Sequence, residues 1–95
     1  KIIKKMIEKQ TIDALISAGK LQEAIDAATA NMQEAPADAV WPFLRGKAYW
    51  RLGQHGRAIS DYELAVSLDP QSPAAAALEM SRDIMDYYNT DLLNP

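Results

Sequence analysis

The residues able to perform acid–base or metal chemistry are few in this chain of 95 residues. His55 is the single histidine and there is no cysteine, which excludes thiol nucleophiles, disulfides, iron–sulfur clusters, thiolate zinc sites and multi-histidine metal sites. His55 lies in the stretch Gly53-Gln54-His55-Gly56, where we expect a solvated turn residue rather than a general base. We therefore predict no metal site and no cofactor.

The carboxylates and glycines form no catalytic pattern either. Catalysis needs a nucleophile beside a base, or paired carboxylates in a pocket. Asp13, Asp83 and Asp86 are spaced as charges on helix surfaces. The pair Gly53-x-x-Gly56 follows an expected helix rather than a strand, and it lacks the spaced lysine of a phosphate-binding loop. We predict that the chain is not an enzyme.

Basic residues are the remaining candidates for a binding site. Arg45, Lys47, Arg51 and Arg57 cluster in the middle of the chain. They form either a solvated helix surface or the rim of a site for an acidic ligand, and both interpretations stay open. The whole chain carries 10 Lys and Arg against 13 Asp and Glu, a net charge of −3. Because phosphate backbones demand a basic surface, we expect no nucleic acid partner.

The elements that would position these residues are helices. Apolar residues recur throughout with the i, i+3, i+4, i+7 spacing of amphipathic helices, and no alternating strand of useful length is present. The predicted apolar stripes cover about residues 3–18, 21–35, 41–52, 58–66 and 74–89. Pro42 must lie in the first turn of its helix, and Ser72-Pro73 predicts an N-cap for the last one. The fold class is therefore all-α, with short loops that make successive helices antiparallel neighbours.

The chain also repeats itself at a constant interval. The recurring pairs are Ala14 and Ala48, Gly19 and Gly53, Ala24-Ile25 and Ala58-Ile59, and Pro36 and Pro70. The glycine allows a tight turn between two helices, the alanine fits where two helix backbones approach closely, and the proline ends the second helix. The sequence therefore predicts two stacked helix pairs.

Residues 39–72 resemble a tetratricopeptide repeat (TPR), whose period equals the interval between these pairs. The matching positions are Gly46, Tyr49, Gly53, Ala58, Tyr62, Ala65 and Pro70, with Trp41 one residue early. Residues 5–38 resemble a degenerate TPR, and about 73–89 resemble the closing helix. The tail is similar to the end of small stand-alone bacterial TPR proteins of unassigned role. The resemblance implies one domain over residues 1–95, folded as an alpha-alpha superhelix of two helix-turn-helix repeats plus a C-terminal capping helix.

The resemblance further implies a concave groove built from the first helix of each pair. The groove residues that it implies are Lys9, Asp13, Ile16 and Ser17, then Phe43, Lys47, Trp50 and Arg51, then Ala77, Ser81 and Met85. Ile16, Phe43 and Trp50 would make an apolar floor with a basic rim, as suits a peptide segment of a partner protein. Alternatively, Phe43 and Trp50 pack under the closing helix and complete a small core.

Some members of this family capture acidic C-terminal tails of chaperones with a clamp of two Lys, two Asn and one Arg. Lys9 matches one clamp position, while Asp13, Leu44, Ala74 and Leu78 occupy the others. An Asp in place of an Asn would repel the carboxylates of the tail, and the distal cations are missing. We expect no useful affinity for such tails.

Two functions remain open. The first is a non-enzymatic interaction module that binds a protein or peptide partner. The second is a structural module that self-associates, or a slice of a longer TPR array. Glu79 and Asp83 lie where a further helix would pack, so we expect a capped C-terminus. The N-terminal edge is instead apolar, with Ile2, Ile3, Met6 and Ile7, which makes a homodimer an alternative.

No apolar run approaches the roughly 18–20 residues of a membrane span. The chain begins with Lys rather than Met, so we expect that it lacks an upstream stretch or is a fragment. The compartment is therefore unassigned, with the cytoplasm slightly favoured.

Overall fold

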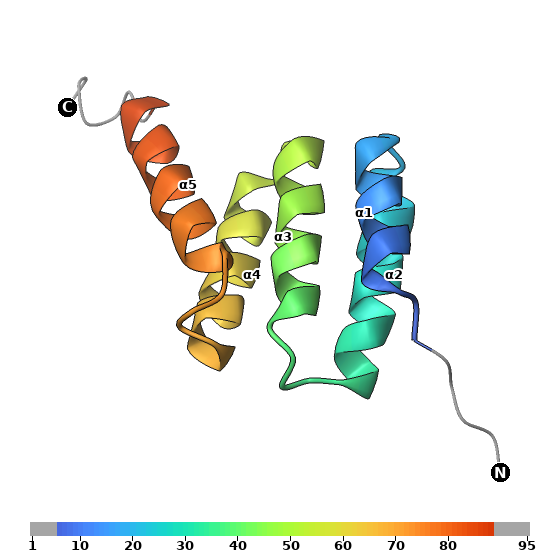
Figure 1. Ribbon diagram of the computed structural model, residues 1–95. Coiled ribbons are helices and arrows are strands. Elements are labelled where there is room, and N and C mark those ends of the chain that lie inside the picture. Colours follow the sequence, from blue (N-terminus) through green and yellow to red (C-terminus); the bar gives the residue numbers. More distant parts are fainter. Residues whose placement is uncertain (1–5, 89–95) are drawn as a thin grey trace, which may run out of the picture.

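Five helices make up residues 6–88, the part of the chain that the computed structural model describes. They are α1 (Lys9–Ser17), α2 (Leu21–Glu34), α3 (Val40–Leu52), α4 (His55–Leu68) and α5 (Ala74–Tyr88). Helices α1 and α2 form one antiparallel pair and α3 and α4 form a second, with α5 against α4 at the end of the stack (Figure 1). The predicted all-α superhelix of helix pairs is confirmed.

The two pairs repeat each other closely. Helices α2 and α4 have the same length and begin and end at equivalent positions of the repeat. Gly19 and Gly53 both adopt left-handed backbone, with φ of 79° and 88°, a conformation that costs glycine little. The amide after each glycine, Lys20 or Gln54, donates to a carbonyl of the preceding helix at 2.9 Å. This shared helix ending turns each second helix back along the first.

Local chemistry also sets the starts of α3 and α5. Pro42 lies in the first turn of α3, as predicted, where the amide that proline lacks would have no helical partner. The Asp38 carboxylate accepts from the Val40 amide at 3.0 Å. The predicted cap is confirmed for α5, because the Ser72 hydroxyl accepts from the Ala74 amide at 3.0 Å.

The start of α1 differs from the prediction. Ile3 lies outside the described residues, and Met6 and Ile7 are not helical, since α1 begins only at Lys9. The Asn31 side chain, 1% exposed, holds the Ile7 backbone instead. The Ile7 amide donates to Asn31 Oδ1 at 3.0 Å, and Asn31 Nδ2 donates to the Ile7 carbonyl at 2.7 Å. A single buried amide therefore replaces helical hydrogen bonds there, which apolar periodicity cannot reveal.

Two buried clusters hold the helices together. The first joins α1, α2 and α3 through Ile12, Ile16, Ala24, Ile25, Ala27, Ala28, Trp41, Leu44 and Ala48. The second joins α3, α4 and α5 through Ala39, Ala58, Tyr62, Ala65, Ala74 and Leu78. Helices α3 and α4 come so close that a Cβ at Gly46 would lie 2.6 Å from Tyr62 Cε1. Small residues at these crossings allow the backbones to approach.

We expect Ala58→Leu to destabilise the protein, because Ala58 is fully buried at the crossing of α3 and α4. Overpacking of this kind costs about 1–3 kcal/mol, and sometimes more. The matched control is Ala76→Leu, which adds the same side chain to an exposed position of α5. Thermal unfolding followed by circular dichroism measures both. Equal melting temperatures for the two variants would contradict the close crossing.

Candidate functional site

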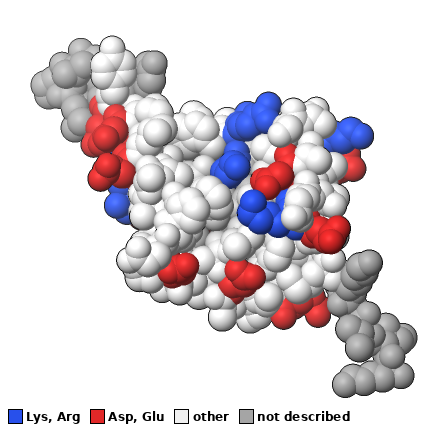
Figure 2. Space-filling view, in the orientation of Figure 1, with Lys and Arg blue, Asp and Glu red and all other residues white. Residues whose placement is uncertain are grey.

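Helices α1, α3 and α5 form one side of the molecule, which we call the inner face (Figure 1). Lys and Arg gather over α1 and α3 on this side, with some carboxylates among them, and further Asp and Glu lie over α5 and along one edge (Figure 2). Much of the surface between α3 and α5 carries no charge (Figure 2). The inner face therefore combines a basic region with a neighbouring uncharged one.

The inner face does not expose every residue that the sequence predicted for it. Ile16 is 5% exposed and belongs to the first core cluster, so it packs between helices rather than forming an open floor. Ser81 is also buried, and its hydroxyl donates to the Ala77 carbonyl at 2.7 Å. Ser17 and Met85 are exposed and Ala77 is half-buried.

Asp13 lies between two lysines at the centre of the basic region. Lys9 Nζ donates to Asp13 Oδ2 at 3.0 Å, and Lys47 Nζ lies 3.9 Å from Asp13 Oδ1. The Lys47 ammonium also lies 5.4 Å from the centre of the Phe43 ring, as in a cation–π contact. All three charged side chains are substantially exposed, and such pairs contribute only about 0–1 kcal/mol. Lys47 can therefore exchange Asp13 for another carboxylate at little cost.

Arg51 links α3 to the end of α1. Its Nη1 donates to the carbonyl of Ile16, one of the last carbonyls of α1. Helix ends leave such carbonyls without partners inside the helix, so a cation there is favourable. Arg51 nevertheless remains exposed as a residue.

Phe43 and Trp50 are half-buried, which combines the two interpretations that the sequence left open. Both pack against the second core cluster, yet part of each ring remains accessible. The Trp50 indole stacks on the His55 ring with centroids 4.0 Å apart and planes 26° apart. The expectation of a solvated turn residue at His55 was wrong, because His55 is the first residue of α4 and covers one side of the indole. The sequence did contain a signal for this contact, because Trp50 lies five positions before His55, on the other side of the turn at Gly53.

Arg45 does not belong to the exposed basic region. Its Nε and Nη2 donate to the two oxygens of Asp61 at 2.8 Å each, and its Nη1 donates to Thr29 Oγ1 at 3.0 Å. Asp61 is 4% exposed, so this bidentate pair is internal and ties α2, α3 and α4 together. The hydrogen bond to Asp61 raises the pKa of Arg45, which stays charged. Burial, assisted by the Asp61 charge, raises the pKa of Tyr62 to about 12.

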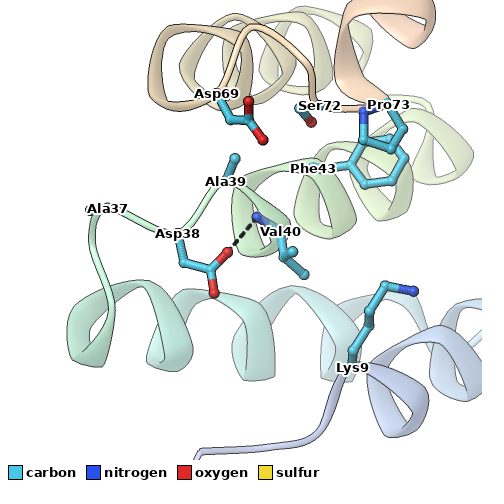
Figure 3. A pocket seen from close by; sticks show the side chains of 9 residues that line it. All are labelled: Lys9, Ala37, Asp38, Ala39, Val40, Phe43, Asp69, Ser72 and Pro73. Carbon is cyan, nitrogen blue, oxygen red and sulfur yellow. Dashed lines mark hydrogen bonds between the residues drawn. The ribbon is translucent and has the colours of Figure 1, made fainter.

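A cavity of about 330 Å³ opens at the start of α3 (Figure 3). Its lining residues are Lys9, Ala37, Asp38, Ala39, Val40, Phe43, Asp69, Ser72 and Pro73. Only Lys9 and Phe43 among them were predicted as site residues. The loops that follow α2 and α4 meet here, and they contain the repeated prolines Pro36 and Pro70. The repeated prolines identify these two loops as equivalent, but neither proline lines the cavity, so the sequence alone did not locate it.

Within residues 6–88, no group of three or more His, Asp or Glu side chains could hold a metal ion. None of the described helices is long and apolar enough to cross a membrane.

Comparison with known proteins agrees with this architecture. The family described as Tetratricopeptide repeat matches residues 43–72, which contain most of α3 and all of α4. The solution NMR structure of Bacteroides fragilis protein BF1650 superposes with a TM-score of 0.84 and 36% identity, over 94% of this chain and 91% of that one. This chain belongs to the TPR family. The resemblance seen in the sequence is therefore confirmed, and a TPR chain is typically a non-enzymatic module for protein–protein interaction.

Two curated relatives are much longer than this TPR chain. It is 36% identical over 77 residues to the heat-shock protein cognate co-chaperone sgt12 of Aspergillus fumigatus. It is 35% identical over 66 residues to RNA polymerase II-associated protein 3 of Xenopus tropicalis. The matches take in 79% and 70% of this chain but only 23% and 10% of those proteins.

The two tryptophans of this TPR protein should differ in their contribution to stability. Trp41 is buried in the first core cluster, so Trp41→Ala should cost about 3–5 kcal/mol. Trp50 is half-buried, stacking on His55 and packing against the second core cluster with only part of its surface, so Trp50→Ala should cost clearly less than Trp41→Ala. Urea unfolding of both variants tests the difference. A cost for Trp50→Ala as large as that for Trp41→Ala would make Trp50 a core residue.

Proposed function

We propose that this TPR protein is a non-enzymatic interaction module that binds a peptide segment of a partner protein on its inner face. The observation that carries the proposal is the row of Phe43, Lys47 and Trp50 on α3, with Arg51 beside it. Residues four and then three positions apart share one side of a helix, so two half-buried rings flank a partly exposed cation. Rings and cations in this arrangement are typical of interface hot spots.

The same row indicates the chemistry of the ligand. An apolar side chain would cover the open parts of the Phe43 and Trp50 rings. A ligand carboxylate would replace Asp13 at Lys47, which is paired only at 3.9 Å, and would also reach Arg51. The favoured ligand is therefore an apolar segment with an acidic residue.

We also propose that residues 1–95 are one domain. Its units would be a repeat over about 5–38, a second over about 39–72 and a closing helix over about 73–89. The equivalent bounds of α2 and α4 within the repeat support this division. Homodimerisation and absence of nucleic acid partners remain expectations from the sequence.

Selection from a random peptide display library on the immobilised full chain tests the ligand chemistry. We expect enriched peptides to place a large apolar residue near Asp or Glu. The best peptide should bind Lys47→Glu at least tenfold more weakly than the unchanged protein, and the loss should be larger at low salt because exposed charges are screened. Trp50→Ala should weaken binding by about 2 kcal/mol.

The control for the charge reversal is Lys20→Glu, an exposed lysine in the turn between α1 and α2. Melting temperatures of all variants exclude unfolding as the cause of weaker binding. Enriched peptides without acidic residues, or equal losses for Lys47→Glu and Lys20→Glu, would contradict the proposal.

Similarity to a co-chaperone raises the question of acidic chaperone tails as ligands. Leu44 and Ala74 are fully buried and Leu78 nearly so, which leaves apolar core residues where the clamp needs polar ones. Lys9, the matching cation, is paired with Asp13 at 3.0 Å. We expect no micromolar binding of a synthetic acidic chaperone tail peptide by titration calorimetry. A micromolar dissociation constant would contradict this expectation.

A further inference from the structure

The first helix pair has a second apolar surface, on the side that faces away from α3. Helices α1 and α2 lie at one end of the stack (Figure 1), and no other described helix covers that side. A shallow cavity of about 460 Å³ opens there. Its lining residues, which we call the α1–α2 edge, are Ile7, Thr11, Leu15, Glu23, Asp26, Ala27 and Ala30.

The internal repeat shows what kind of element fits such a surface. The counterparts of Ile7, Thr11 and Leu15 in the second repeat are Trp41, Arg45 and Tyr49 on α3. Trp41 and Tyr49 pack in or against the core cluster that α2 and α3 share, and Arg45 Nη1 donates to Thr29 of α2. In the second pair, this surface is therefore covered by a helix, namely α2. The equivalent surface of the first pair lacks such a helix among the described residues.

The α1–α2 edge is also more apolar than its counterpart. The internal ion pair of Arg45 and Asp61 corresponds, in the first repeat, to Thr11 and Ala27. The first pair thus has no charged pair at this position, and Ile7 is 38% exposed. A helix with a continuous apolar stripe would bury these side chains without desolvating an ion pair.

Charge narrows the choice of partner. The charged residues of the edge, Glu23 and Asp26, are both acidic, and both are exposed. Head-to-tail stacking of two copies would bring them toward the exposed carboxylates of α5, which are Glu79, Asp83 and Asp86. Like charges across an interface oppose association. A second copy of this chain is therefore the wrong occupant, and a basic helix is the right one.

We infer that the α1–α2 edge is a second docking surface, which binds an amphipathic helix of a partner protein whose apolar stripe is flanked by Lys or Arg. The apolar stripe covers Ile7, Leu15 and Ala27, and the basic residues pair with Glu23 and Asp26. This surface lies outside the inner face, so it does not depend on the peptide site proposed above.

Two probe peptides test the inference on the full chain. The first has the sequence of α2, residues 21–34, with the exposed Gln22, Glu23, Asp26, Gln33 and Glu34 replaced by Lys. The second is the unmodified, acidic α2 sequence and serves as the control. Amide chemical shifts in ¹⁵N-labelled protein locate each binding site and give each affinity. We expect the basic probe to bind at least tenfold more tightly and to shift Thr11, Leu15 and Ala27.

Variants of the protein distinguish binding at the α1–α2 edge from nonspecific attraction of the basic probe to acidic surfaces. Thr11→Arg places bulk and positive charge in the cavity. It should weaken binding of the basic probe at least tenfold. The control is Gln10→Arg, since Gln10 is a neighbouring exposed residue of α1 that does not line the cavity. This substitution should have little effect on the affinity of the basic probe. Glu23→Lys combined with Asp26→Lys should reverse the preference in favour of the acidic probe.

Several results would overturn the inference. Chemical-shift changes confined to α3 and α5 would place the basic probe elsewhere. Self-association that Thr11→Arg abolishes, seen by sedimentation, would assign the edge to a second copy. Binding of the probe only after removal of residues 1–5 would assign the edge to the chain's own N-terminal segment. Changes at the inner face would leave these readouts unaffected, so failure here is distinguishable from failure of the proposed peptide site.

Discussion

The Arg45 guanidinium is the group on which the polar contacts between helices depend, because it pairs with Asp61 within the second helix pair and reaches Thr29 of the first. The guanidinium bonds both oxygens of a buried carboxylate on α4 and the hydroxyl of Thr29 on α2. The Thr29 hydroxyl in turn donates to the Ile25 carbonyl at 2.7 Å, so the hydrogen bonds continue to the backbone of α2. Removing one partner of such a buried pair leaves an uncompensated charge, which typically costs about 3–5 kcal/mol. The surrounding alanines and Gly46 matter because they let the three helices approach closely enough for this contact.

The same pair also determines which cations of α3 stay at the surface. Because Arg45 is used inside the molecule, the cations of α3 on the inner face are Lys47 and Arg51. Lys47 has only a partly exposed, exchangeable partner, and Arg51 uses one donor at the end of α1. Two half-buried rings lie on the same helix, supported from below by the second core cluster. The closely packed α3 therefore presents a partly apolar, partly cationic row of side chains to solvent.

Repetition explains why this small protein offers more than one surface. Each helix pair covers its neighbour on one side, and a stack with ends leaves the last pair uncovered. At the α1–α2 edge, Thr11 and Ala27 stand where the second repeat has the Arg45–Asp61 ion pair, and Ile7 and Leu15 are apolar. At the other end, α5 exposes carboxylates together with Met80, which is 63% exposed and occupies the repeat position of Gly46. Both ends therefore carry exposed carboxylates, but they differ in the apolar residues beside them.

The sequence by itself determined the features that depend on neighbours a few residues away. Five helices, the turns at Gly19 and Gly53, the Ser72 cap and the family all follow from spacing and local hydrogen bonding. Only the tertiary structure decided that Arg45 is internal while Lys47 stays partly exposed beside Asp13, that Ile16 is buried, and that His55 stacks on Trp50. It also decided that Asn31 holds Ile7 out of α1. The physical reason is that these side chains contact residues on other helices or across a turn. The same sequence pattern is compatible with several such contacts.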